Sequence, residues 1–166
     1  CAESEEDKET TASTDNTTSS SDDSSDNSTS TSDNSSTTDT TAPTVSSISS
    51  TTDNQSKISV TDNISVTFSE AMDATSVTTN TSDTTCSGSL QFSSDNFSTC
   101  VKMSSLPTIS NTNKTFTLSP SDNLSNYTSY KTIVTTAVKD SSGNTLIRKF
   151  ESSSITTVNT EISVVV

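Results

Sequence analysis

The sequence predicts an all-β antiparallel sandwich that follows a long N-terminal tether. Residues 2–41 contain no large apolar side chain, whereas apolar residues beyond Pro43 recur in short alternating runs. Alternation with a period of two is typical of a strand with one buried and one polar face. The runs are separated by clusters of Ser, Asp, Asn and Gly, which favour turns. Several such strands over about 110 residues indicate a two-sheet sandwich.

The N-terminal arm, residues 1–42, is strongly acidic. About 75 of the 166 residues in the chain are Ser or Thr, and the net charge is −13. Eleven acids in the arm stand against one base, Lys8, so the arm carries most of that charge. A segment that buries no apolar surface cannot offset the entropy of ordering its backbone. We therefore expect a disordered tether with a reach of roughly 35 Å as a flexible coil.

The folded body is expected over residues 43–157, with 158–166 as a C-terminal tail or edge strand. About 29 large apolar side chains between Val45 and Val158 are enough for one modest core. No segment shows a sustained helical stripe, although residues 69–77 can form a short turn. The predicted strands are Val45–Ser49, Ile64–Ser69, Ser89–Phe92, Cys100–Ser104, Thr115–Leu118, Ser129–Thr135 and Lys149–Thr157.

The composition excludes several classes of function. Binding to nucleic acid requires clustered Lys and Arg, and the chain has 8 bases against 21 acids. Histidine is absent, which removes Ser-His-Asp and Cys-His catalysis as well as the commonest metal ligand. No apolar run approaches the roughly 18 residues that a membrane-spanning helix needs. We therefore expect a protein that is not an enzyme and does not bind nucleic acid.

Cys1 opens the sequence and is followed by the acidic, Ser/Thr-rich arm. This arrangement resembles a mature bacterial lipoprotein, in which a signal peptide is removed before the Cys and the thiol receives diacylglycerol. Two or more acyl chains, such as palmitate, anchor a protein stably where one chain binds marginally. The resemblance implies lipidation at Cys1 and attachment to a lipid bilayer. An Asp directly after the Cys signals retention at the inner membrane, so Ala2 at that position favours the outer membrane. The alternative to lipidation is that Cys1 marks an arbitrary start.

Cys86 and Cys100 flank the run 89–92 and lie 14 positions apart. Outside the cytosol such a pair most often forms a disulfide. A zinc site is disfavoured because the spacing is wrong and no His is available. Reactive free thiols are disfavoured because no neighbouring base would stabilise a thiolate. We predict a Cys86–Cys100 disulfide.

Four segments in order resemble a known family. They are residues 43–49 (Pro-Thr-Val-Ser-Ser-Ile-Ser), 63–73 (Asn-Ile-Ser-Val-Thr-Phe-Ser-Glu-Ala-Met-Asp), 115–120 (Thr-Phe-Thr-Leu-Ser-Pro) and 130–144, which ends Val-Lys-Asp-Ser-Ser-Gly-Asn. This order is similar to the bacterial immunoglobulin-like domain of the S-layer-protein type, often called SbsA Ig-like. The resemblance implies an immunoglobulin-like sandwich and a role at the cell surface.

The residues of these segments also have physical interpretations of their own. Ile64, Val66 and Phe68 fall on one face of a strand and are expected in the core. Leu124, six positions before Tyr130, resembles the corner in which a Tyr hydroxyl bonds to nearby backbone.

One group of residues suggests a metal site. In a sandwich of this topology, the loop after the second strand and the loop before the last strand lie at the same end. Glu70, Asp73, Asp140 and Asn144 would then converge as hard oxygen ligands suited to Ca²⁺. The alternative is that Glu70 and Asp140 accept hydrogen bonds from loop backbone while the other two face solvent.

These observations favour a surface-displayed lipoprotein whose Ig-like module serves adhesion, envelope structure or spacing, with a protein or glycan as its ligand. One alternative is a stalk protein similar to a eukaryotic cell-wall mannoprotein. That alternative predicts a C-terminal GPI signal, and residues 162–166 are too short for one unless the signal has been trimmed. Another alternative is a carbohydrate- or calcium-binding accessory module of a secreted enzyme, against which the absence of Trp counts.

Overall fold

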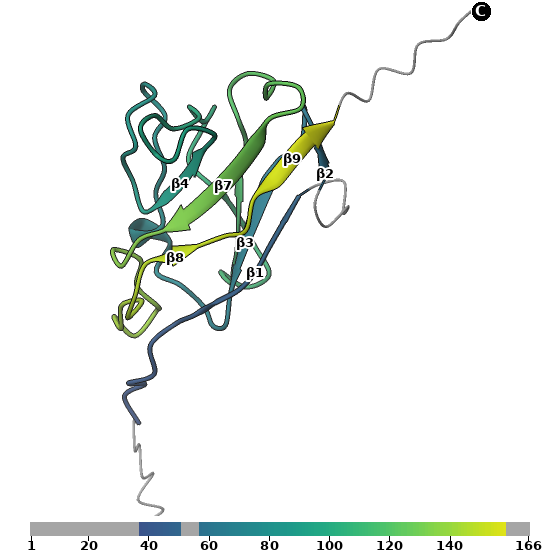
Figure 1. Cartoon of the computed structure of the whole chain (residues 1–166). Helices are drawn as coiled ribbons and strands as arrows, with labels where there is room; N and C mark the ends of the chain where they lie inside the picture. Colours follow the sequence, from purple (N-terminus) through teal and green to yellow (C-terminus); the bar gives the residue numbers. More distant parts are fainter. Residues whose placement is uncertain (1–36, 51–56, 159–166) are drawn as a thin grey trace, which may run out of the picture. The chain divides into compact units, whose positions relative to one another are not determined.

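The computed structural model describes residues 37–50 and 57–158, and a compact unit begins at Thr37. Its first sheet has four antiparallel strands in the order β1-β3-β6-β5. Figure 1 shows β1 beside β3 along one edge of the molecule. The bounds of these strands are β1 Val45–Ser50, β3 Ile64–Phe68, β5 Thr108–Ser110 and β6 Thr115–Leu118.

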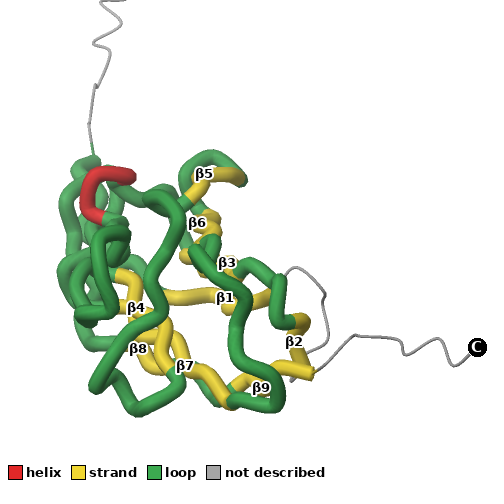
Figure 2. The backbone as a smooth tube through the Cα atoms, turned by 90° about the horizontal axis from the view of Figure 1, so that it is seen from above, coloured by secondary structure: helices red, strands yellow, loops and turns green. Residues whose placement is uncertain are grey.

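The second sheet has the order β2-β9-β7-β4, with β8 paired to β7. Its pairs are antiparallel except β2–β9, which is parallel. Figure 2 shows the two groups of strands as separate layers. The bounds are β2 Lys57–Ser59, β4 Leu90–Ser93, β7 Ser129–Val134, β8 Phe150–Glu151 and β9 Ile155–Val158.

In the described residues, the helical content is a single 3-10 turn, η1, at Ala74–Ser76, inside the segment where a short turn was expected. None of the described helical structure is long and apolar enough to cross a membrane. The prediction of an all-β sandwich is confirmed, with every described strand pair antiparallel except β2–β9.

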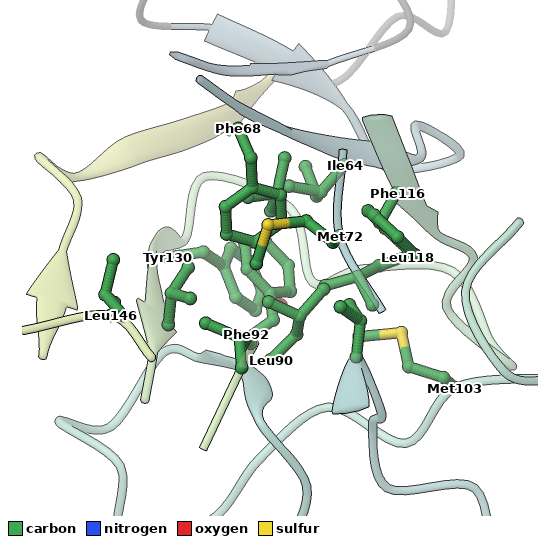
Figure 3. Close-up of a cluster of buried hydrophobic side chains, with 14 of the residues drawn as sticks. Ile64, Phe68, Met72, Leu90, Phe92, Met103, Phe116, Leu118, Tyr130 and Leu146 are labelled. Atoms are coloured by element: carbon green, nitrogen blue, oxygen red, sulfur yellow. The ribbon is translucent and has the colours of Figure 1, made fainter. Parts of the chain in front are cut away.

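The core lies between the two sheets and is built around aromatic pairs (Figure 3). The rings of Phe68 and Phe116 meet edge to face, with centroids 5.9 Å apart. Phe92 stacks on Tyr130 at 4.9 Å. Such pairs add about 0.5–1.5 kcal/mol beyond the area they bury. Ile64, with 0% of its surface exposed, lies in the same cluster, so the predicted core face of this strand is confirmed.

The outward face of the first sheet explains part of the high Ser and Thr content. Ser65 and Thr117 face one another across β3 and β6, with hydroxyl oxygens 2.8 Å apart. Thr67 and Thr115 form a second pair at 3.0 Å. The residues of β1 and β5 that pair with these four are also Ser or Thr. They are Ser47, Ser49, Thr108 and Ser110.

Two of the predicted strands are wrong, and two strands of the structure are not predicted. Residues 100–104 alternate as expected, and Met103 is fully buried, but their backbone groups bond to several partners in place of one neighbouring strand. The predicted strand 149–157 is two short strands, β8 and β9, separated by residues 152–154. The predicted list also omitted β2 and β5, each three residues long.

Candidate functional site

Three carboxylates converge at one end of the sandwich. Asp39, Glu70 and Asp140 each place a carboxylate oxygen within 4.8 Å of the other two. Glu70 follows β3, and Asp140 lies in the loop after β7, so the two loops meet at the same end as predicted. An isolated antiparallel bridge between Met72 and Asp140 joins these loops. Asp39 reaches the cluster from the segment that precedes β1.

Asp140 is buried, with 1% of its surface exposed, and its carboxylate organises the loop 140–144. Its Oδ1 accepts hydrogen bonds from the backbone N–H groups of Ser142 and Asn144, both at 2.8 Å. Its Oδ2 accepts from the side-chain amide of Asn144 at 2.8 Å. Burial raises the pKa of Asp140, but these hydrogen bonds, led by that of the Asn144 side chain, outweigh it and lower the pKa overall.

Glu70 has the opposite electrostatic environment. Burial raises its pKa most, followed by a hydrogen bond to Asp39 and the negative charges of Asp39 and Asp140. Lys114 opposes this rise. The pKa of Asp39 is lowered, mainly because its carboxylate accepts the backbone N–H of Thr41 at 2.8 Å. Glu70 is therefore the carboxylate of the three that most readily keeps a proton.

The other two predicted ligands take different roles. Asp73 lies outside the cluster and caps η1. Its Oδ1 accepts hydrogen bonds from the backbone N–H of Thr75 at 2.9 Å and from the Thr75 hydroxyl at 2.7 Å. Both hydrogen bonds lower the pKa of Asp73. Asn144 contacts the cluster through its amide nitrogen, which donates to Asp140 and to the backbone carbonyl of Asp39 at 3.0 Å.

Sequence reasoning assigned Asp39 to the tether and so missed it as a cluster member. Residue 39 lies in the stretch without large apolar side chains, and its neighbours give no local signal of order. Its position depends on two contacts that the sequence does not reveal: the Thr41 N–H on its carboxylate and the Asn144 amide on its carbonyl.

The cluster has the donor chemistry of a hard-cation site, because carboxylate oxygens are what Ca²⁺ prefers. Asp140, however, already accepts protein hydrogen bonds on both oxygens. For this residue the structure agrees with the alternative interpretation, in which a carboxylate holds loop backbone. Calcium binding stays a prediction.

The predicted disulfide between Cys86 and Cys100 is present, with Cα atoms 4.9 Å apart. It ties the long loop before β4 to the loop after it. The backbone N–H of Cys100 also donates to the carbonyl of Thr84 at 2.8 Å, so the two segments are linked twice. Cys1, the predicted lipidation site, lies outside the described residues.

A family model for the bacterial Ig-like domain matches residues 39–157. The chain therefore belongs to the bacterial Ig-like domain family. No curated protein matches the chain.

A solved S-layer structure shares its fold. The crystal structure of the N-terminal part of the bacterial S-layer protein SbsC matches with a TM-score of 0.50 and 17% identity, over 71% of this chain and 24% of that chain. A structure of SbsC domains 1–6 matches with a TM-score of 0.49 and 16% identity, over 70% of this chain and 14% of that chain. This chain thus corresponds to about a quarter or less of those S-layer chains.

Proposed function

We propose that this chain is a non-enzymatic, surface-displayed lipoprotein. In this proposal an acyl anchor on Cys1 attaches to a lipid bilayer, and the acidic arm holds one Ig-like module away from it. The observation that carries the proposal is the change near Thr37, where an acidic sequence without large apolar side chains gives way to a compact Ig-like domain.

The domain itself supports a role in presentation. Bacterial Ig-like domains are typically structural modules that carry no catalytic site. The carboxylates that converge at one end fit this role, because Asp140 fixes a loop and Asn144 links that loop to Asp39. A domain whose polar clusters hold its own loops in place suits adhesion, envelope structure or spacing.

A location in the bacterial cell envelope, with the outer membrane as the attachment site, fits the proposal. The S-layer protein SbsC contains domains of similar fold. A protein or glycan at the cell surface is the expected ligand of the module. The stalk of a eukaryotic wall protein is less well supported, because the family matched is bacterial.

The test is the chemistry of Cys1 in the native protein. Mass spectrometry of the N-terminal peptide should show a diacylglyceryl thioether on the sulfur, with or without acylation of the amine. Replacement Cys1→Ser should move the protein from the membrane fraction to the soluble fraction. A native Cys1 with an unmodified thiol would contradict the lipoprotein proposal. It would not bear on the assignment of the Ig-like fold.

A further inference from the structure

An apolar groove separates the start of β1 from the segment that leads into β8. It has a volume of ≈ 510 Å³, within the usual range for ligand sites, and is lined by residues 43–45 and 146–150. Leu146 belongs to the hydrophobic core, and Val45 and Phe150 pack against that core. The groove therefore exposes the side of the core where β1 and β8 approach each other.

The mouth of the groove combines an exposed apolar side chain with two cations. Ile147 has 76% of its surface exposed, the largest fraction among the large apolar residues described as exposed. Arg148 and Lys149 follow it and are exposed as well. Neither cation makes a hydrogen bond or an ion pair with another residue in the described ranges. A partner that buries Ile147 and brings negative charge would satisfy both features.

Each strand beside the groove has one edge that pairs with no other described strand. β1 is the end strand of its sheet, and within the described part of the chain β8 pairs with β7 alone. A free sheet edge is a common place for an extended segment to add through its main chain, while pockets beside the edge accept alternate side chains.

We propose that this groove binds residues 161–166 of a second copy of the chain. These residues, Glu-Ile-Ser-Val-Val-Val, lie outside the described part, and only their sequence enters the argument. Ile162, Val164 and Val166 alternate with other residues, so an added strand would direct all three to one face. Glu161 precedes them and brings a negative charge to Arg148 and Lys149, neither of which forms an ion pair within the described ranges.

The reach of the chain favours a second copy over the same chain. β9 leads away from the groove, and the eight residues from Phe150 to Val158 cover about 26 Å when extended. Figure 1 shows β8 and β9 following one another along the molecule. The four residues from Val158 to Ile162 span at most about 14 Å, which is too short to return to the groove. A contact in trans closes into a dimer when two copies exchange their segments reciprocally, and builds rings or linear chains when they do not. This inference goes beyond the proposed function and does not require the acyl anchor.

The experiment measures association of the full chain carrying Cys1→Ser, which prevents an unrelated disulfide between copies. Sedimentation velocity and light scattering should give an average mass that rises with concentration to at least twice that of the monomer. Ile147→Glu and Val164→Asp should each weaken this association by about tenfold or more. Leu106→Glu alters another exposed apolar residue (61% exposed) and is the matched control, expected to leave association unchanged.

Charge reversal gives the sharper test. Arg148→Glu with Lys149→Glu should weaken association, and adding Glu161→Lys should restore it. Equal melting temperatures of the variants would exclude unfolding as the cause. A chain that stays monomeric at all concentrations, or oligomers that persist in both Ile147→Glu and Val164→Asp, would overturn the inference. The acylation state of native Cys1 has no bearing on either result, so the two proposals fail separately.

Discussion

The hydroxyl oxygen of Tyr130 accepts a hydrogen bond of 3.0 Å from the backbone N–H of Ser125. The Tyr130 ring is 4% exposed and stacks on Phe92, so a core residue of β7 also fixes the loop that precedes its own strand. Leu124, the neighbour of Ser125, is 5% exposed and belongs to the same core. The corner predicted from the spacing of Leu124 and Tyr130 is confirmed.

Tyr130→Phe keeps the ring and removes the hydroxyl, so it should lower the free energy of unfolding by about 1 kcal/mol, the net value of one hydrogen bond. Urea denaturation followed by circular dichroism measures the change. Tyr127→Phe is the matched control, because Tyr127 is 74% exposed and should tolerate the loss of its hydroxyl. Equal stabilities of the two variants would show that the corner contributes nothing.

Loss of the Cys86–Cys100 disulfide should lower the free energy of unfolding by about 3 kcal/mol, because the bond closes a loop of about 15 residues and restricts the unfolded chain. The double variant Cys86→Ala with Cys100→Ala tests this in guanidinium. Adding a reductant to the parent protein should give the same shift. Cys1→Ser should be neutral for folding, and a reductant effect that survives in the double variant would contradict the prediction.

Gly88→Ala should be strongly destabilising. A Cβ at this position would lie 2.7 Å from the Cα of Thr79, and Gly88 has a φ of 85°, which side-chain-bearing residues rarely adopt. Overpacking and left-handed strain together cost about 3 kcal/mol. Gly143→Ala has a comparable φ of 94° but no atom within 4 Å, so it should cost about 1 kcal/mol, from backbone strain alone. Thermal unfolding of both variants separates the two effects, and a Gly143→Ala variant as unstable as Gly88→Ala would rule out the clash.

Glu70→Gln should stabilise the domain at neutral pH by about 0.5 kcal/mol, a value typical of a partly exposed charge interaction. The folded-state pKa of Glu70 is raised above its ordinary value of 4.5, so the folded state binds this proton more tightly than the unfolded state. Its contribution to stability is present below that ordinary value and is lost as the pH rises through the folded pKa.

The control for this pH dependence is Glu151→Gln. A hydrogen bond and then the charge of Lys131, in an ion pair of 2.9 Å, lower the pKa of Glu151. Its contribution is present above the ordinary value and lost as the pH falls, so the two variants should change the pH profile of the melting temperature in opposite directions. Parallel shifts would show that the charges around Glu70 are not repulsive.

The calcium prediction has a separate test. Ca²⁺ at the cluster would offset the negative charges and relieve the repulsion among the three carboxylates. Titration calorimetry should then record heat for the parent and none for Glu70→Gln, and the melting temperature should rise with Ca²⁺ in the parent alone. An absence of heat together with an unchanged melting temperature would remove calcium as a ligand.

The sequence predicts best where a strand is long and half buried. β3 and β6 follow from their alternation, because Ile64 and Phe116 face the core while Ser65 and Thr117 face outward. β2 and β5 could not be predicted, because each is three residues long and contributes a single large apolar side chain, Ile58 or Ile109. Such strands form only because a longer neighbour offers free backbone groups.

The segment 100–104, in contrast, has the sequence pattern of a strand but does not form one. Val101 and Met103 alternate as in a strand, and Met103 is buried. The Val101 N–H, however, bonds to Phe92 and the Met103 N–H to Asn80, so no single neighbour forms a ladder with the segment. Alternation records which side chains point inward and does not identify the backbone partner.

The acidic cluster could be predicted only in part. Glu70 and Asp140 follow from the topology, whereas the position of Asp39 depends on long-range contacts.

The hydroxyl pairs across β3 and β6 affect how the stability of the domain responds to salt and pH. No strand position on that outer face carries an ionisable group, so its cross-strand contacts have nothing for dissolved ions to screen and nothing to titrate. The contacts between these strands should therefore hold equally well in dilute and in concentrated salt solution.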